Sequence, residues 1–279
     1  MTKIILKLSM IILFLMSNML KAQDFSGQAV YETKIQMKDF KIEMGDIPEE
    51  MRLKMQEKMR KAFEKTFIMD FNKTESLYYP EEKLEAPSQG SDISFKMSGP
   101  ADGKKYKNVK DKIEISEEDF FGKEFLIQDS LPRWDWKLES ETKKIGNYNC
   151  NKAVAVIPVS AESLKEYEDE KKKSAENKTK FLEIKEPKEQ IITVWYTPEI
   201  PVSQGPDGYW GLPGLILEVN DGNKMTLCSK IVLNPKQKLE IKKPKKGKKV
   251  TRKEFEKINE EQLEKMKNSS GNIEIHIGR

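Results

Sequence analysis

Hydrophobic and polar residues alternate along many short stretches of this chain, with the period of two that is typical of β-strands with one buried face. The clearest is 190–196, QIITVWY, which is rich in β-branched and aromatic residues. Because polar or glycine-containing turns separate several stretches, we predict about ten strands in one antiparallel sheet that curls on itself or forms a half-barrel. The other strand candidates are 27–36, 65–72, 75–79, 105–109, 112–116, 124–129, 134–138, 148–159, 215–219, 225–233 and 272–278.

Helical patterns interrupt these strands, so the predicted class is mainly β (α+β) with two or three helices. Residues 49–65 form one amphipathic candidate, in which Met51, Met55 and Met59 recur every four residues. Thr251 and Glu254 have the spacing of a capping box, which predicts a second helix with Phe255 on its apolar face. The Lys- and Glu-rich stretch 160–179 is interpreted as a solvated insert that could be helical.

The first 22 residues have the features of a secretory signal peptide. Lys3 and Lys7 precede an apolar run, and Ala22 is a suitable small residue before a cleavage site at Gln23. We therefore expect export to the periplasm or the extracellular space, with an uncleaved N-terminal anchor as the alternative. No later stretch is apolar enough to be a transmembrane segment. The expected organisation is a signal peptide at 1–22, a β domain at 23–235 with inserts near 43–65 and 160–179, and a basic linker, helix and terminal strand at 236–279.

The charge balance argues against a nucleic-acid partner. The full chain has a formal net charge of +4, and removing Lys3, Lys7 and Lys21 leaves 47 basic and 46 acidic residues, a net charge of +1. Nucleic-acid binding needs a clustered positive surface. The basic stretch 236–249 could contact anionic lipid headgroups or lipopolysaccharide. A solvated linker is the favoured interpretation, because Glu240 and the Glu-rich helix that follows offset its charge.

Few residues offer catalytic or metal chemistry, so no cofactor and no catalytic residue are predicted. His276 is the only histidine and lies on a terminal alternating stretch, where an exposed or edge position is favoured over a general base. Met51, Met55 and Met59 could hold Cu(I) through their thioethers, but an apolar face that packs on the sheet is favoured. Cys150 and Cys228 either form a disulfide in an oxidising compartment or remain two unpaired thiols.

The most distinctive segment is 205–219, GPDGYWGLPGLILEV. Pro213 and Gly214 fit the central positions of a type II turn, and proline makes such a loop cheap to order. Tyr209 and Trp210 lie between the turns. If they point outward they form a contact surface together with Leu212 and Pro213, and if they point inward they cap the end of the sheet.

The stretch 211–216 reads GLPGLI and resembles, letter for letter, the motif of the GLPGLI family of exported Bacteroidetes proteins. Other blocks are similar to that family: 75–78 (ESLY), 136–138 with 141–145, 148–153 (YNCNKA) and 195–201 (WYTPEIP). The resemblance covers about residues 25 to 235 and implies neither an established activity nor catalytic residues. The expected strand order is also similar to half-barrel carriers that sort outer-membrane lipoproteins, an analogy of fold alone.

The sequence leaves three functional hypotheses. The first is an exported cell-envelope binding or assembly protein without catalytic activity, which acts through a concave β face or the 205–216 loop on an envelope protein or an apolar ligand. The second is a hydrolase with paired carboxylates, and the third a copper-handling protein with methionine ligands. Acidic residues that face each other in a pocket would favour the hydrolase, converging methionine sulfurs would favour copper, and an apolar cavity would favour the binding protein.

Overall fold

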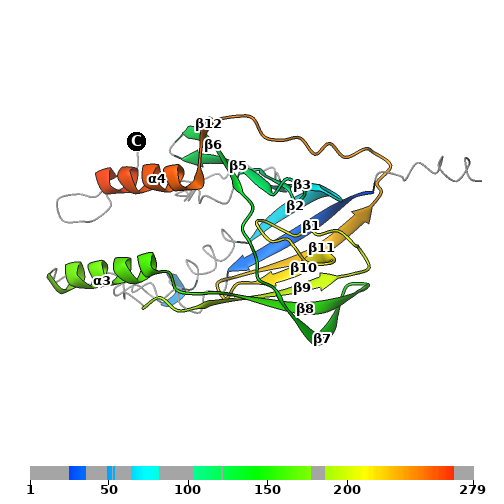
Figure 1. Ribbon diagram of the computed structural model, residues 1–279, viewed down its shortest axis with the longest axis horizontal. Coiled ribbons are helices and arrows are strands. Elements are labelled where there is room, and N and C mark those ends of the chain that lie inside the picture. The colour runs from blue at the N-terminus through cyan, green and yellow to red at the C-terminus, as the bar shows by residue number, and fades with distance from the viewer. Residues whose placement is uncertain are drawn as a thin grey trace, which may run out of the picture.

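A single antiparallel sheet forms most of the molecule (Figure 1). The computed structural model describes residues 25–35, 49–51, 53, 64–81, 103–120, 122–176 and 186–266. Its strand order is β12-β6-β5-β4-β3-β2-β1-β11-β10-β9-β8-β7, and only β12, which joins β6, is parallel to its neighbour. The elements are β1 (Ser26–Ile35), β2 (Lys65–Asn72), β3 (Glu75–Pro80), β4 (Lys105–Asn108), β5 (Ile113–Phe120), β6 (Lys123–Ser130), β7 (Lys137–Ile145), β8 (Tyr148–Ile157), α3 (Ala161–Glu176), β9 (Gln190–Thr197), β10 (Leu215–Asn220), β11 (Lys224–Leu233), β12 (Lys248–Val250) and α4 (Arg252–Met266).

The mainly β class with helices is confirmed, but the sheet is open. Its edge strands β7 and β12 do not pair with each other, and the sheet does not curl on itself as predicted. One face receives the long connection between β9 and β10 instead, so a loop supplies the cover that a curled sheet would give. Among the described residues, no helix is long and apolar enough to cross a membrane.

Several predicted boundaries need correction. The strand expected at 134–138 begins only at Lys137, because Trp134 and Trp136 lie in an extended connection between β6 and β7. The helix expected at 49–65 ends earlier, since Glu64 is not helical and Lys65 starts β2. Within the stretch taken for a basic linker, 248–250 form the short strand β12. The expected signal peptide at 1–22 and the terminal strand at 272–278 lie outside the described residues.

The apolar core lies on both faces of the central strands. In β10, Leu215, Ile216 and Leu217 are all buried, which requires cover on each face of that strand. Tyr31, Met69 and Phe71 form one large cluster with Leu215 and Leu217. Ile216 belongs to a second cluster, with Val194, Tyr196 and Leu212.

The two described long helices differ in how they contact the sheet. Helix α4 begins with the predicted capping box: Thr251 Oγ1 accepts the Glu254 backbone N–H at 3.2 Å, and Glu254 accepts the Thr251 N–H at 2.7 Å. Its Phe255 packs edge-on against Phe120 and Phe125 of the sheet. In contrast, the described side chains of α3 are exposed or half-buried, as expected for a solvated insert.

Candidate functional site

A row of polar side chains crosses one face of β4, β5 and β6. Strand pairing places Lys105 beside Ser116, Lys107 beside Glu114, and Glu114 beside Asp129. Side chains at paired positions project to the same face. The face therefore carries a compact group of opposite charges next to an otherwise apolar core.

The connection between β9 and β10 lies across this row and is held there by two lysines. The buried Lys107 amine donates hydrogen bonds to the backbone oxygens of Gly205 at 2.6 Å and Tyr209 at 2.9 Å. Lys105 forms an ion pair with Asp207 of the same loop, and its amine lies 3.7 Å from Glu114. The side chains of Lys105 and Lys107 in β4 thus hold residues 205–209 against the face of the sheet.

Three indole N–H groups hold the same loop from the side. Trp134 donates to the Gly208 carbonyl at 3.0 Å and Trp136 to the Trp210 carbonyl at 2.8 Å. Trp210 donates in return to the Pro132 carbonyl at 2.8 Å. The Trp134 ring stacks on Tyr209 and on Trp136, with centroids 4.9 and 5.3 Å apart. Two connections far apart in sequence therefore form one rigid wall.

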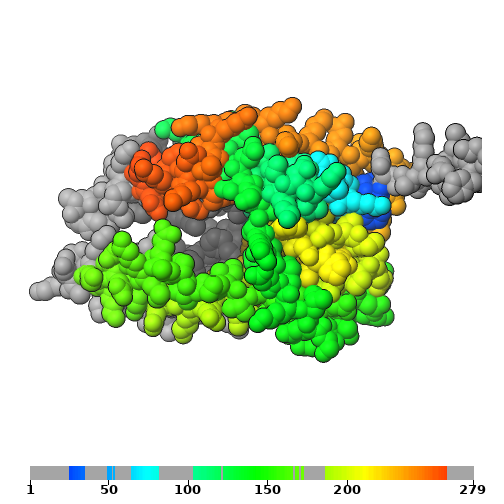
Figure 2. All heavy atoms as spheres, in the orientation of Figure 1, coloured from blue at the N-terminus to red at the C-terminus, as the bar shows by residue number. Residues whose placement is uncertain are grey.

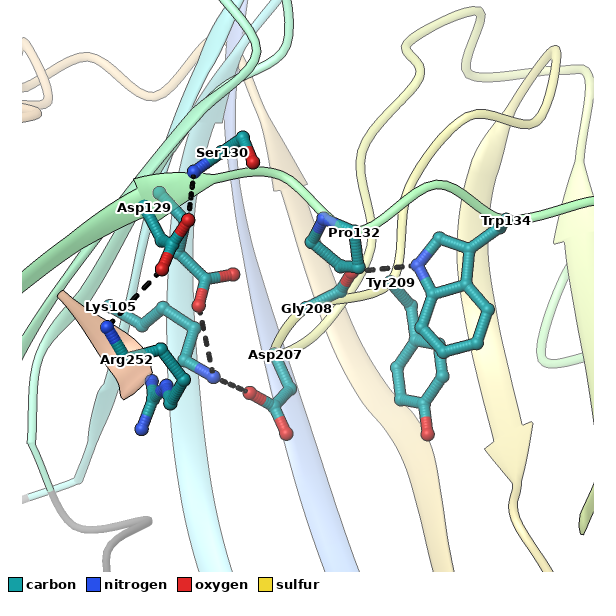
Figure 3. Close-up of a pocket in the computed structure, with 10 residues that line it drawn as sticks. Lys105, Asp129, Ser130, Pro132, Trp134, Asp207, Gly208, Tyr209 and Arg252 are labelled. Carbon is teal, nitrogen blue, oxygen red and sulfur yellow. Dashed lines mark hydrogen bonds and ion pairs between the residues drawn. The ribbon is translucent and has the colours of Figure 1, made fainter. Parts of the chain in front are cut away.

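A pocket of about 390 Å³ lies between this wall, the polar row and the start of α4 (Figure 3). Arg252, the first residue of α4, closes one side: its backbone N–H bonds Asp129 at 3.2 Å, and its guanidinium bonds the Ser116 hydroxyl at 3.2 Å. In Figure 3, Lys105 and Asp207 face the Tyr209 ring across the pocket. The lining residues are Lys105, Glu114, Asp129, Ser130, Pro132, Trp134, Asp207, Gly208, Tyr209 and Arg252.

Burial and close charges shift several pKa values around the pocket. Burial lowers the pKa of Lys107 to about 7, although Glu114 and Asp207 act in the opposite direction. Burial would raise the pKa of Asp207, but Lys105, Lys224 and Lys107 outweigh it and hold that pKa well below its usual range. Beside the pocket, burial raises the pKa of Glu118 to about 7 against the attraction of Arg252. Such clustering of shifted groups at a cavity is typical of functional sites.

The charged groups of the pocket already have partners. Asp207 pairs with Lys105 and Lys224, and Asp129 accepts the backbone N–H groups of Ser130 and Arg252. Glu114 differs: one of its oxygens faces Lys105, while its buried Oε2 has no hydrogen-bond partner among the described residues. Since a general base must reach a substrate proton, the pairing favours binding over proton transfer.

The predicted contact residues of the loop are distributed differently. Tyr209 is only 9% exposed and Leu212 is 2% exposed, so both side chains point inward. For Tyr209 this agrees with the alternative in which the aromatic residues of the loop cap the sheet. Trp210 is half-buried and Pro213 is exposed. Of the four, only Tyr209 lines the pocket. The GLPGLI stretch thus supports the loop rather than lining the site, and its role as a contact surface stays a hypothesis.

The remaining candidate chemistry is not assembled in the described part of the chain. Cys150 and Cys228 are buried free thiols, so the possible disulfide is not formed, and burial raises their pKa values to about 11 and about 12. Met51 is 58% exposed, whereas Met55, Met59 and His276 lie outside the described residues. Within the described ranges, no three His, Cys, Asp or Glu side chains are grouped so that they could hold a metal ion.

Sequence reasoning missed the polar row and Arg252. The stretches 105–109 and 112–116 were predicted only as strands, with no role assigned to Lys105, Lys107 or Glu114. The useful signal was weak: Asp207 and Gly208 form a tight bend directly before Tyr209 and Trp210. Nothing in the sequence shows that this bend meets β4.

Comparisons with known proteins find one partial family match and two distant structural similarities. A family described as "Protein of unknown function (Porph_ging)" matches residues 136–218, which include β7 to β9 and the GLPGLI stretch. The chain is thus similar to a family of unknown function over that range, and its assignment to the GLPGLI family stays a prediction. No curated protein matches the chain.

Two solved structures of PNGF-II, in space groups C2 and P21, are distantly similar. Each has a TM-score of 0.47 and 16% sequence identity over 84% of this chain. The chain spans about a third of their length, 32% and 33%.

Proposed function

We propose that the chain is an exported protein of the cell envelope that binds a small polar ligand in the pocket beside residues 205–209, without catalysing a reaction. The observation that supports this most is the pocket itself. It is lined by charged groups that already have partners, and it is walled by a loop that two lysines and three tryptophans hold in place. A site that is ordered before its ligand arrives loses little entropy on binding.

The lining favours a neutral ligand with hydroxyl or amide groups. Lys105 and Arg252 are matched by Glu114, Asp129 and Asp207, so the pocket has no surplus positive charge for a phosphate or a nucleotide. The unpartnered Glu114 Oε2 would accept a hydrogen bond from such a ligand. Tyr209 and Trp134 would contact its apolar side. A purely apolar ligand would leave the buried Glu114 Oε2 without a hydrogen-bond partner.

The hydrolase alternative receives less support. Two carboxylates in a glycosidase flank the scissile bond, one as an acid and one as a nucleophile or base. Here Asp207 and Asp129 each accept hydrogen bonds from other groups, and Lys105 lies between Asp207 and Glu114. Glu118 has the raised pKa that an acid would need, but it is buried against Arg252 and is not among the pocket-lining residues.

Calorimetric titration with probes of three kinds tests this proposal. The neutral polar probes are N-acetylglucosamine and diglycine, the phosphorylated probe is glucose 6-phosphate, and the apolar probe is palmitate. We expect saturable binding of a neutral polar probe and little binding of the other two. Gly208→Leu should abolish it, because the new side chain would extend toward Glu114 and Pro132. Ser140→Leu adds the same group on the exposed edge strand β7 and should bind as the parent does. Preferential binding of palmitate, or turnover of a glycoside probe lost in Asp207→Asn, would contradict the proposal.

A further inference from the structure

The segment between β11 and α4 forms a ridge of exposed lysines that is independent of the pocket. Figures 1 and 2 show it in orange along one side of the molecule. All lysines of 236–249 are exposed. We call this set the basic strip: Lys236, Lys238, Lys242, Lys243, Lys245, Lys246, Lys248 and Lys249.

The backbone under the basic strip is fixed, unlike that of the solvated linker expected from the sequence. Ile241 packs against the apolar cluster of Leu77, Tyr106, Ile115 and Leu126. Pro244 is buried, and 248–250 pair with β6. Gly247 has a φ of 110°, and a Cβ there would lie 2.7 Å from the Phe125 backbone carbon, so only glycine allows this close approach. The backbone positions of the lysines along the surface are therefore fixed.

Most of this positive charge is not neutralised. Lys242 pairs with Glu240, Lys246 pairs with Glu124 of β6, and Lys243 lies over the Tyr106 ring at 5.5 Å. The other five form no ion pair with any part of the chain that the structure describes: Lys236, Lys238, Lys245, Lys248 and Lys249. Since the chain without residues 1–22 has a formal net charge of only +1, this strip makes the charge distribution strongly one-sided.

We propose that the basic strip docks the protein on a membrane surface that carries anionic lipid headgroups. Exposed polybasic segments are attracted to such surfaces by their summed charge rather than by a built pocket. The composition agrees, because lysine acts as a mobile point charge, whereas recognition of a single phosphate favours the planar fork of arginine. The strip is also extended, which suits a two-dimensional array of headgroups.

Vesicle sedimentation tests the docking. The full chain should bind vesicles of phosphatidylglycerol and phosphatidylcholine at 50 mM salt, and binding should fall steeply at 500 mM. Replacing Lys236, Lys238, Lys245, Lys248 and Lys249 with Gln should weaken partitioning by about 1,000-fold or more, given the effect of each lysine near such a surface. The matched control replaces five exposed lysines elsewhere with Gln, and should bind within about twofold of the parent, since charges far from the surface are screened. These are Lys137 and Lys144 of β7, Lys165 and Lys172 of α3, and Lys188 before β9.

Three further arms decide what the strip recognises. Vesicles of pure phosphatidylcholine carry no net charge, so they measure binding that does not depend on electrostatic attraction, including any through the apolar N-terminal residues. Inorganic phosphate at matched ionic strength should compete no better than chloride, because no single phosphate site is proposed. A DNA duplex should bind more weakly than the anionic vesicles. The proposal is overturned if anionic vesicles are not bound, if both lysine variants lose binding equally, if phosphate displaces the protein selectively, or if DNA binds more tightly.

Discussion

Two adjoining segments, 205–210 within the β9–β10 connection and 211–216 leading into β10, have different roles and are called the two halves below. Residues 205–210 lie over polar side chains, and their backbone carbonyls accept hydrogen bonds from Lys107, Trp134 and Trp136. Residues 211–216 pack into apolar clusters through Leu212, Leu215 and Ile216. The recognisable motif is therefore the half that fixes the loop, whereas the adjoining half forms the site. A short motif can mark a scaffold beside a binding site rather than the site itself.

The largest expected effect is a difference in stability between substitutions at two glycines, one in each half. A Cβ at Gly214 would lie 2.2 Å from the Thr197 carbonyl oxygen, so Gly214→Ala must displace backbone. We expect a loss of about 4 kcal/mol or more in the free energy of unfolding. At Gly208 the nearest atom is Glu114 Oε2 at 3.6 Å, and Gly208→Ala should stay within about 0.5 kcal/mol of the parent. Urea unfolding of both variants measures this, and equal losses would erase the distinction between the halves.

The next largest effect concerns Lys107, whose amine holds residues 205–209. Lys107→Met leaves the carbonyls of Gly205 and Tyr209 without their donor, which should cost about 2–3 kcal/mol near pH 8. The loss should depend on pH. Because the pKa of Lys107 falls from 10.5 to about 7 on folding, the unfolded chain holds an extra proton between these values, and the stability of the parent rises from pH 7 to pH 10.

Unfolding of the parent and Lys107→Met at pH 6.5, 8 and 9.5 checks both parts. The gap between them should widen with pH. A constant gap would mean that Lys107 keeps an ordinary pKa in the folded protein.

A smaller effect is expected where Trp136 holds the junction of the two halves. Trp136→Phe keeps an aromatic ring but removes the N–H that bonds the Trp210 carbonyl. We expect a loss of about 1 kcal/mol and weaker binding of whichever probe the pocket takes. Thermal unfolding and calorimetric titration measure the two effects. If stability falls but affinity does not, the wall is not part of the site.

The smallest effect tests the motif's exposed residue. Pro213 is exposed and does not line the pocket, so Pro213→Ala should lower stability by about 0.5 kcal/mol, through the more flexible unfolded chain, and leave probe binding unchanged. Chemical denaturation and the same titration provide the measurement. Loss of probe binding would instead support the hypothesis that Pro213 belongs to a contact surface.

Local features were predictable because nearby residues determine them. The alternation of 190–196 gave β9, and Thr251 with Glu254 gave the start of α4. The open form of the sheet was not predictable, since it depends on whether the distant strands β7 and β12 meet. Trp134 and Trp136 show the same limit: they alternate like a strand but lie in a connection that packs on the loop.

The pocket could not be predicted because its parts are far apart in the chain. Lys105 meets Asp207, and Arg252 meets Ser116, at separations of 102 and 136 residues. Alternation shows which residues share a face, but it cannot show that a loop and a helix cover that face. Charged residues opposite an apolar strand face are usually solvated, so alternation alone gives no sign of a buried polar row.

Arg252 links helix α4 to the pocket on the sheet. It is the first residue of α4, next to β12, and its side chain reaches Ser116 while its backbone bonds Asp129. An appendage at the end of the chain therefore supplies one side of the cavity. Substitutions at the start of α4 should therefore change what the cavity accepts without altering the strands beneath it.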